Sequence, residues 1–199
     1  MPAGFDRLQR REAPLVAAGL AGVHARWLLE IAPTASASPD LSVERCRVLV
    51  DGATCRWPFR APLDLWPLED RSVPLILLRH VWQPAIEVDP LDEALRVLKP
   101  NGVLISVTAN PWHHLAWREI GRDALRLPSW PHFQILHARR GFSLATPMAS
   151  QVRGFVPGLS AALVLVARKP AEPARIEPLR FSRPQAAPGA AAVTQCRAA

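Results

Sequence analysis

Two continuous apolar segments, separated by an amphipathic one, constrain the fold of this chain most strongly. The apolar segments are Ser72–Arg79 and Gly102–Thr108. Runs of this length without alternation are typical of strands that helices cover on both faces. Between them, Asp89–Leu98 carries leucines at helical spacing, and Lys99–Gly102 has the composition of a turn. The order strand, helix, strand predicts two parallel strands joined by a helical crossover.

The rest of the chain continues this pattern. Further helices are expected at 8–23, with Pro14 as a break or restart, and at 111–127; further strands are expected at 26–31, 46–51, 148–155 and 161–168. Residues 53–71 and 128–140 show no clear periodicity. The last two strands lie close in sequence, which favours an antiparallel hairpin. We therefore expect an α/β fold: a Rossmann-like, mostly parallel sheet with helices on both faces and an antiparallel C-terminal strand pair.

The domain organisation follows from length and local composition. A chain of 199 residues fits one domain and a tail. Residues 1–168 contain the predicted strands and helices and form the expected α/β domain. Residues 169–199 are rich in Pro, Ala and Arg and have few large apolar side chains, which predicts a disordered tail.

Charge and cysteine usage restrict the partners and the compartment. The net charge is +7, but the arginines are dispersed and only weakly support nucleic acid as a partner. No run approaches the roughly 18 apolar residues of a membrane span, and the N-terminus lacks the apolar core of a secretory signal. The three cysteines, Cys46, Cys55 and Cys196, are too few and scattered for a disulfide framework. These features predict a cytoplasmic protein that has reduced thiols and no membrane partner.

A family resemblance is carried by the segment from Asp64 to Pro111. Asp64 and Trp66-Pro67 precede a strand that ends near His80, and the following helix ends in Arg-Val-Leu-Lys-Pro-Asn-Gly at 96–102. Asn110-Pro111 follows the next strand. This arrangement resembles the second half of a class I S-adenosylmethionine (SAM) dependent methyltransferase of the methyltransferase type 11-like family. The narrower Asn-Pro resemblance is to a divergent bacterial subgroup. The likeness extends over residues 26–168 and includes Gly141-Phe142.

The first half of the chain departs from that family pattern. Glu30 occupies the place of the acidic residue at the end of the first strand. The glycine-rich loop of the family is replaced by Ala32–Ala37, which contains no glycine. Glycine lets a backbone turn tightly and approach a ligand closely, whereas proline removes a donor. The resemblance therefore implies SAM as the cofactor, and the departure predicts that its binding in the standard mode is weakened or lost.

The resemblance assigns residues to a cofactor site. Glu30 and Ala32 stand at the first strand end. Asp51 follows the second strand, where it accepts hydrogen bonds from ribose hydroxyls or forms a turn before Gly52. Asp64 contacts the adenine amino group or is a solvated loop acid, and Leu65 packs on the ring. His80 faces the methyl donor or substrate, or is a hydrogen-bonded structural histidine.

Substrate and metal assignments complete the prediction. Asn110 and His113 are the substrate-binding candidates, because they follow the fourth expected strand. His113 and His114 are adjacent and point in different directions on a helix, so we expect no metal site. No catalytic residue is assigned.

Two main function hypotheses follow, beside the weakly supported possibility of a polyanion binder that uses the arginine excess. The first is a SAM-dependent methyltransferase that acts on an unknown small-molecule or macromolecular acceptor. SAM itself carries the reactive sulfonium, so a missing general base does not exclude this activity. The second is a catalytically inactive, methyltransferase-like binding or regulatory protein, which the glycine-free Ala32–Ala37 segment favours.

Overall fold

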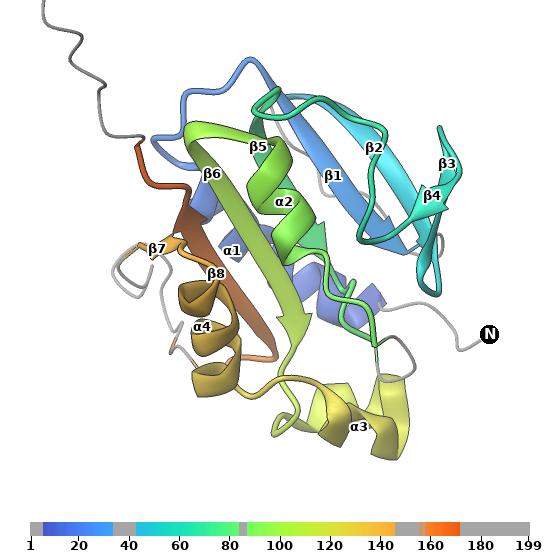
Figure 1. Cartoon of the computed structure of the whole chain (residues 1–199). Helices are drawn as coiled ribbons and strands as arrows, with labels where there is room; N and C mark the ends of the chain where they lie inside the picture. Colours follow the sequence, from blue (N-terminus) through green and yellow to red (C-terminus); the bar gives the residue numbers. More distant parts are fainter. Residues whose placement is uncertain (1–5, 34–42, 84–86, 146–155, 157, 172–199) are drawn as a thin grey trace, which may run out of the picture.

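The computed structural model describes residues 6–33, 43–83, 87–145, 156 and 158–171 (Figure 1). Its helices are α1 (Asp6–Leu20), α2 (Leu91–Val97), α3 (His114–Ile120), the 3-10 helix η1 (Gly121–Arg126) and α4 (Trp130–Arg139). Its strands are β1 (Trp27–Pro33), β2 (Glu44–Asp51), β3 (Thr54–Trp57), β4 (Ala61–Pro62), β5 (Val73–Arg79), β6 (Leu98–Ala109), β7 (Ser143–Leu144) and β8 (Ala162–Arg168).

The described strands form one sheet in the order β4-β3-β2-β1-β5-β6-β8-β7. The four central strands β2, β1, β5 and β6 are parallel neighbours. The β3–β4 hairpin extends the sheet antiparallel at one edge, and β8 and β7 extend it antiparallel at the other. The predicted α/β fold with a mostly parallel sheet and antiparallel C-terminal strands is confirmed. The predicted strand at 148–155 lies outside the described residues.

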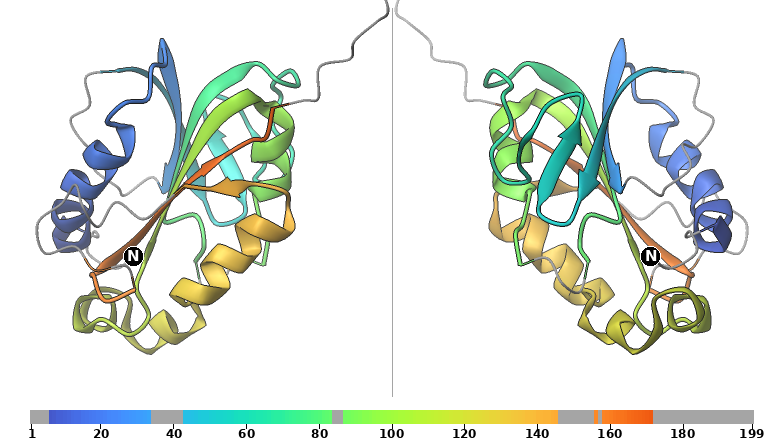
Figure 2. Two further views of the ribbon diagram at one scale, coloured as in Figure 1. Left: turned by 90° about the vertical axis from the view of Figure 1, so that its left-hand side faces the viewer. Right: turned by 90° about the vertical axis from the view of Figure 1, so that its right-hand side faces the viewer.

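Helices cover both faces of the sheet, as predicted. Figure 2 shows α1 against one face and α2 and α4 against the other. Side chains of β5 alternate between the two sides: Leu75 and Leu77 pack under α1, whereas Ile76 and Leu78 pack on the α2 side. All four are fully buried. Because both faces of β5 are covered, its residues from Val73 to Leu78 are apolar on both sides, which accounts for the continuous run in the sequence.

The first helix begins and ends earlier than predicted and is not interrupted. The sequence indicates a break at Pro14, but α1 continues through it. Pro14 is exposed, whereas Leu8, Leu15 and Val16 are buried. We attribute the continuity to this packing, because burial of the apolar stripe offsets the hydrogen bond that proline removes.

The junction between α2 and β6 differs from the predicted turn. β6 begins at Leu98, directly after α2, so Lys99–Gly102 belongs to the strand. Asn101 has a φ of 62°, a conformation that asparagine tolerates better than most residues. Asn101 N donates to Lys169 O (3.2 Å), and Lys169 Nζ donates to the carbonyls of Leu95 (2.7 Å) and Leu98 (2.8 Å). Lys169, at the start of the predicted tail, is thus joined to the domain; residues 172–199 lie outside the described residues.

The helical region after β6 also differs from the prediction. The helix expected at 111–127 is divided into α3 and η1 at Gly121, which has a φ of 76°. The region expected to be irregular at 128–140 contains α4. Pro131 lies in the first turn of α4, and Gly141 lies just after its end; both residue types are common at helix boundaries. Neither residue led to a predicted helix, because the segment has no leucines at regular helical spacing. The unpatterned segment 53–71 likewise contains the short strands β3 and β4.

Candidate functional site

The strand order places a topological switch point between β1 and β5. The chain passes from β1 to β2 on one side and later returns to β5 on the other side. Open α/β sheets bind ligands in the crevice at the carboxyl ends of the strands that flank such a point. In this chain β1 ends at Ala32-Pro33, and β5 ends at Arg79, with His80 directly after it.

A buried ionic network connects these strand ends to α1. Arg79 donates from Nε to Glu12 Oε1 (2.8 Å) and from Nη1 to Glu30 Oε1 (2.8 Å), and its Nη2 also contacts Glu12. His80 Nε2 lies 2.7 Å from Glu12 Oε2. Glu12 and Glu30 are fully buried, and Arg79 is 1% exposed. The network therefore fixes α1 against the carboxyl ends of β1 and β5.

The network also sets the protonation of Glu12. Burial alone raises the pKa of this carboxyl, but the charges and hydrogen bonds of His80 and Arg79 overcome that effect and hold its pKa below the ordinary value. Glu12 is thus ionised at neutral pH. His80 has a φ of 48°, an uncommon conformation that is enriched for histidine and often found at functional sites.

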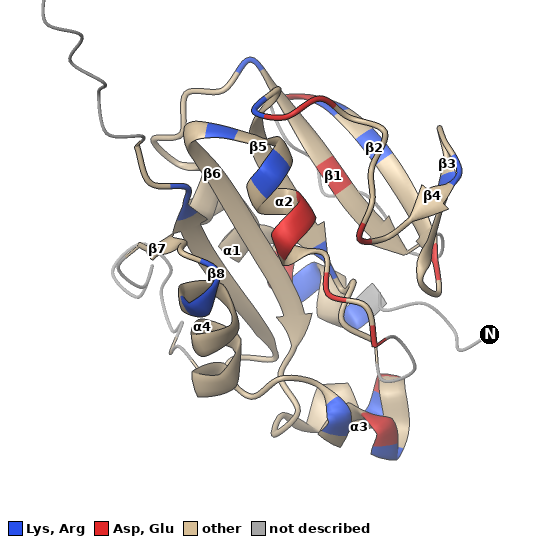
Figure 3. Cartoon of the chain, in the orientation of Figure 1, with Lys and Arg blue, Asp and Glu red and all other residues tan. Residues whose placement is uncertain are grey.

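Two predicted cofactor residues lie on β1, at this network. The Glu30 carboxylate accepts from Arg79 and also lies 3.8 Å from Arg45 Nη1 and 3.9 Å from Arg47 Nε. Figure 3 shows the acidic segment of β1 beside basic segments of β2. Ala32 is fully buried next to the end of the strand. Glu30 is therefore positioned by three arginines beneath the switch point.

Three further predicted residues lie at the same edge of the sheet. β4 runs parallel to β2, because each is antiparallel to β3, so Asp51, the last residue of β2, and Asp64, two residues after β4, lie at carboxyl strand ends. Leu63 N donates to Ala53 O (2.9 Å), which holds the two loops together. Asp51, Asp64 and Leu65 are exposed, and Asp51 pairs with Arg56 at 3.1 Å. Exposed carboxylates and an apolar side chain thus share the β2 side of the edge.

The two predicted substrate residues have structural contacts. Asn110 is 2% exposed and donates from Nδ2 to the carbonyls of Gly158 (2.7 Å) and Ser160 (2.9 Å). Its Oδ1 accepts from Trp112 N (3.0 Å). His113 caps α3, because its Nδ1 accepts from Leu115 N (3.2 Å). Asn110 thereby fixes the backbone of Trp112, which borders a cavity.

That cavity lies at the carboxyl ends of β5 and β6 and has a volume of about 470 Å³. Small-molecule sites commonly have volumes of roughly 300–1,000 Å³. Its walls come from the segments after β5 and β6, from the end of η1 with the following loop, and from α4. They are Trp82, Gln83, Pro111, Trp112, Leu125, Arg126, Leu127, Pro128, Ser129, His132 and Leu136.

No protein-family model matches this chain, and no curated protein matches it. Solved structures do. A SAM-dependent methyltransferase from Aquifex aeolicus superposes with a TM-score of 0.56 at 14% identity, covering 84% of this chain and 94% of that one. The [4+2]-cyclase SpnF gives 0.54 at 15% identity, covering 85% and 84%. A SAM-dependent methyltransferase from Thermotoga maritima, described as a possible histamine N-methyltransferase, gives 0.50 at 16%, covering 83% and 94%.

The chain has the class I SAM-dependent methyltransferase fold. The resemblance noted from the 64–111 segment is confirmed at the level of fold. A methyltransferase fold alone does not establish methyl transfer, because one fold can carry several chemistries. SpnF, described as a cyclase, is an example among these structures.

The described residues match the nucleoside part of SAM better than its methionine part. Asp51 and Asp64 offer carboxylate acceptors for ribose hydroxyls and an adenine amino group, and Leu65 offers an apolar surface. At the end of β1, Pro33 has no N–H to donate, and Glu30 is already bonded to Arg79. Residues 34–42, which follow β1, lie outside the described residues.

Sequence reasoning missed the residues that organise this region. Glu12 and Arg79 are 67 positions apart, so no local spacing links them. Trp82 and Arg126 were not singled out, although both border the cavity. The available signals were a charged residue at the end of an apolar strand, for Arg79, and an aromatic residue two positions after His80, for Trp82.

None of the helices in the described part of the chain has the length and apolar composition of a membrane span. Nor do these residues contain a His, Cys, Asp or Glu cluster of the kind that holds a metal ion. Cys46 and Cys55 are free thiols, and burial raises the pKa of Cys55 to about 11.

Proposed function

We propose that this protein is a SAM-dependent methyltransferase whose acceptor binds in the cavity beyond β5 and β6. The observation that carries the proposal is the position of that cavity at the carboxyl edge, next to the switch point between β1 and β5. In open α/β sheets this is where ligands bind. Neighbours of the same fold described as SAM-dependent methyltransferases support it further.

The cofactor assignment uses the residues that the sequence predicted. Asp51 would hold the ribose hydroxyls and Asp64 the adenine amino group, with Leu65 against the ring. Bound SAM supplies a sulfonium-activated methyl group, so the chemistry requires alignment above all. Ala32 and His80 lie at the ends of β1 and β5. The part of SAM beyond the nucleoside would extend past these two residues.

The chain's own residues would bind and orient the acceptor. Asn110 fixes the backbone at Trp112, and Pro111 O accepts from Trp117 Nε1 (2.8 Å), so this part of the wall is held by two side chains. Leu127 and Pro111 are buried and exclude water from the cavity side that they form. Glu12, through Arg79 and His80, positions the β5 end rather than reacting.

Calorimetry with SAM and with S-adenosylhomocysteine tests the cofactor part of the proposal. We expect saturable binding of both to the intact chain. Asp64→Ala should weaken it about tenfold, because it removes a hydrogen bond to a charged acceptor. Glu69→Ala, at another exposed loop acid, is the matched control and should leave affinity unchanged. Equal affinities for the two variants would remove Asp64 from the site.

A second candidate is the catalytically inactive binding protein. It is favoured by the buried Glu12–Arg79–Glu30 network, in which the carboxylate of Glu30, near the end of β1, already accepts a hydrogen bond from Arg79. It is also favoured by the glycine-free segment that follows. No heat and no thermal shift at millimolar SAM would support this candidate over the enzyme.

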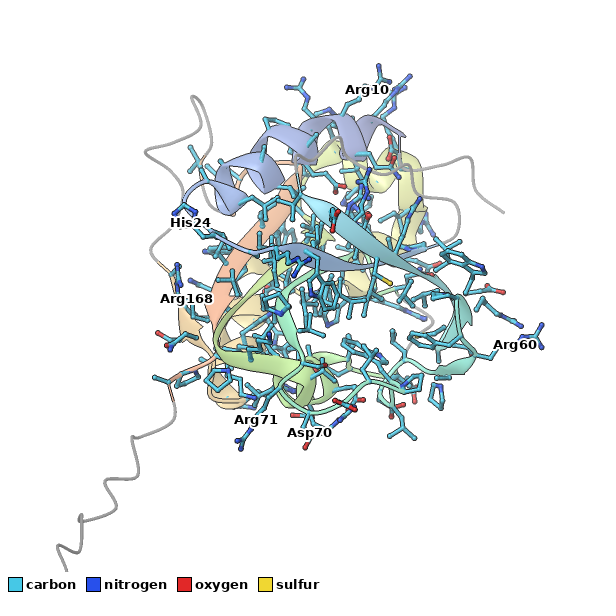
Figure 4. The ribbon with its side chains drawn as sticks, turned by 90° about the horizontal axis from the view of Figure 1, so that it is seen from above. Arg10, His24, Arg60, Asp70, Arg71 and Arg168 are labelled. Atoms are coloured by element: carbon cyan, nitrogen blue, oxygen red, sulfur yellow. The ribbon has the colours of Figure 1, made fainter. Side chains whose placement is uncertain are left out.

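Nucleic acid remains a weaker hypothesis for the acceptor. Figure 4 shows Arg10 pointing outward from α1, whereas Arg60, Arg71 and Arg168 lie on other sides of the molecule. These four arginines therefore do not share one face. Association with RNA whose affinity falls steeply with salt would support a polyanion partner.

A further inference from the structure

The cavity beyond β5 and β6 has walls that favour one class of ligand. Seven of its eleven lining residues have aromatic or aliphatic side chains, and two of these are tryptophans that come from successive strand ends. Trp82 follows β5, and Trp112 follows β6. Because β5 and β6 are parallel neighbours, both indoles are brought to the same edge of the sheet.

Trp82 is held in place by its aromatic neighbours. Its ring meets Phe133 edge to face, with centroids 5.0 Å apart and an interplanar angle of 89°. It also packs on His137 at 5.9 Å. Phe133 and His137 are fully buried. The indole is therefore fixed before a ligand arrives, which reduces the entropy lost on binding.

Trp112 is exposed but its backbone is anchored. Its side chain is 74% exposed, which is unusual for the largest apolar side chain. The Asn110 carboxamide bonds its N–H, and Trp117 bonds the preceding carbonyl. An indole kept in water on a fixed backbone at the border of a cavity offers a flat surface on which an aromatic ligand can stack.

The charge of the cavity is positive. Arg126 is the one Arg or Lys among the lining residues, which include no Asp or Glu. Arg126 is exposed, and among the described residues its side chain has no hydrogen-bond or ion-pair partner. A guanidinium without a partner next to two indoles favours an anion with a planar body, because it can bind a carboxylate through two hydrogen bonds.

We propose that this cavity binds a flat aromatic molecule that carries a carboxylate, with the ring against Trp82 and Trp112 and the carboxylate on Arg126. Its role as the methyl acceptor rests on the proposed function; its binding does not. Indoles also attract cations, but here no carboxylate in the lining would assist a cation and Arg126 would repel it.

Titration calorimetry with three ligands of one shape tests the proposal, using the full chain without SAM. The ligands are naphthoate, naphthamide and naphthylmethylammonium. We expect naphthoate to bind about tenfold more tightly than naphthamide, because a charge-assisted bidentate contact is stronger than a neutral one. The ammonium should bind most weakly.

Two variants and a control assign the contacts. Arg126→Gln should remove the preference for naphthoate over naphthamide. Arg122→Gln changes the net charge equally, at an exposed residue that does not line the cavity, and should preserve that preference. Trp112→Ala should weaken both aromatic ligands at least fivefold, in line with the loss of one stacking surface. Far-UV circular dichroism checks that each variant is folded.

Three results would overturn the proposal: no binding of naphthoate at millimolar concentration, equal affinity for naphthoate and naphthamide, or the same loss of preference in Arg126→Gln and Arg122→Gln. These outcomes are separate from the SAM titration. Naphthoate binding without SAM binding would refute the methyltransferase and leave the aromatic-acid site standing. SAM binding without naphthoate binding would refute the aromatic-acid site and leave the methyltransferase proposal standing.

Discussion

Protonation of His137 should make the protein less stable as the pH falls below neutrality. The imidazole is fully buried between α4 and β6, with Nδ1 2.8 Å from Phe133 O and Nε2 2.8 Å from Ser106 Oγ. A carbonyl can only accept, so Nδ1 carries the proton and Nε2 accepts from the Ser106 hydroxyl. Burial lowers the pKa of His137 to about 4. The folded state therefore holds the neutral ring.

The sign and size of the effect follow from proton linkage. Between the unfolded pKa of 6.5 and the folded value of about 4, the unfolded chain binds a proton that the folded chain does not. The contribution of His137 to the free energy of unfolding is therefore fully present above pH 6.5 and is lost as the pH falls through this window. At 1.36 kcal/mol per unit, the full loss is about 3 kcal/mol, of which about 2 kcal/mol falls between pH 7 and pH 5.

Urea unfolding at a series of pH values measures this loss directly. The double variant His137→Leu with Ser106→Ala replaces both partners by apolar groups and should abolish about 2 kcal/mol of the dependence between pH 7 and pH 5. His132→Leu, an exposed histidine on the same helix, is the control and should keep it. His113, whose pKa is also lowered by burial, contributes in the same direction in all three proteins. If the double variant keeps the wild-type slope, the assignment of the neutral buried ring is wrong.

Two further predictions concern the buried network and the thiols. Arg79→Met leaves Glu12 and Glu30 buried without their main partner, so the free energy of unfolding in urea should fall by about 3–5 kcal/mol. The control variant Arg26→Met, at an exposed site, should change it by less than about 0.5 kcal/mol. An equal, small change in both variants would contradict the network's role. Cys46 is exposed, whereas Cys55 is buried and burial raises its pKa to about 11. A thiol reagent at pH 8 should therefore label Cys46 rapidly and Cys55 only on unfolding, which peptide mass spectrometry measures. Equal labelling rates in the folded protein would refute the burial of Cys55.

The sequence predicted the centre of the sheet well, because burial on both faces restricts a strand to a recognisable apolar pattern. Every position of β5 faces a covered side, so its apolar run identifies a buried strand without further information. α4 was missed for the opposite reason. Its buried face consists of Phe133 and His137 alone, and its start is marked by Pro131, so leucine periodicity is absent. Helix-boundary residues were the usable signal there.

The candidate site was predicted less completely, because its contacts join distant segments. Asp51 and Asp64 could be proposed from their positions after strands, and the structure brings their loops together. Glu30 was assigned from its position at a strand end, but its carboxylate pairs with an arginine 49 positions away. Long-range ion pairs of this kind depend on which strands become neighbours, and one sequence does not specify that directly.

The most direct measurement is a crystal structure of the protein grown with S-adenosylhomocysteine. We expect the adenosine at the carboxyl ends of β1 and β2, with its ribose on Asp51, and the sulfur directed toward the cavity bordered by Trp82 and Trp112. Crystals saturated with the ligand that show this edge empty, or the nucleoside bound elsewhere, would contradict the methyltransferase account.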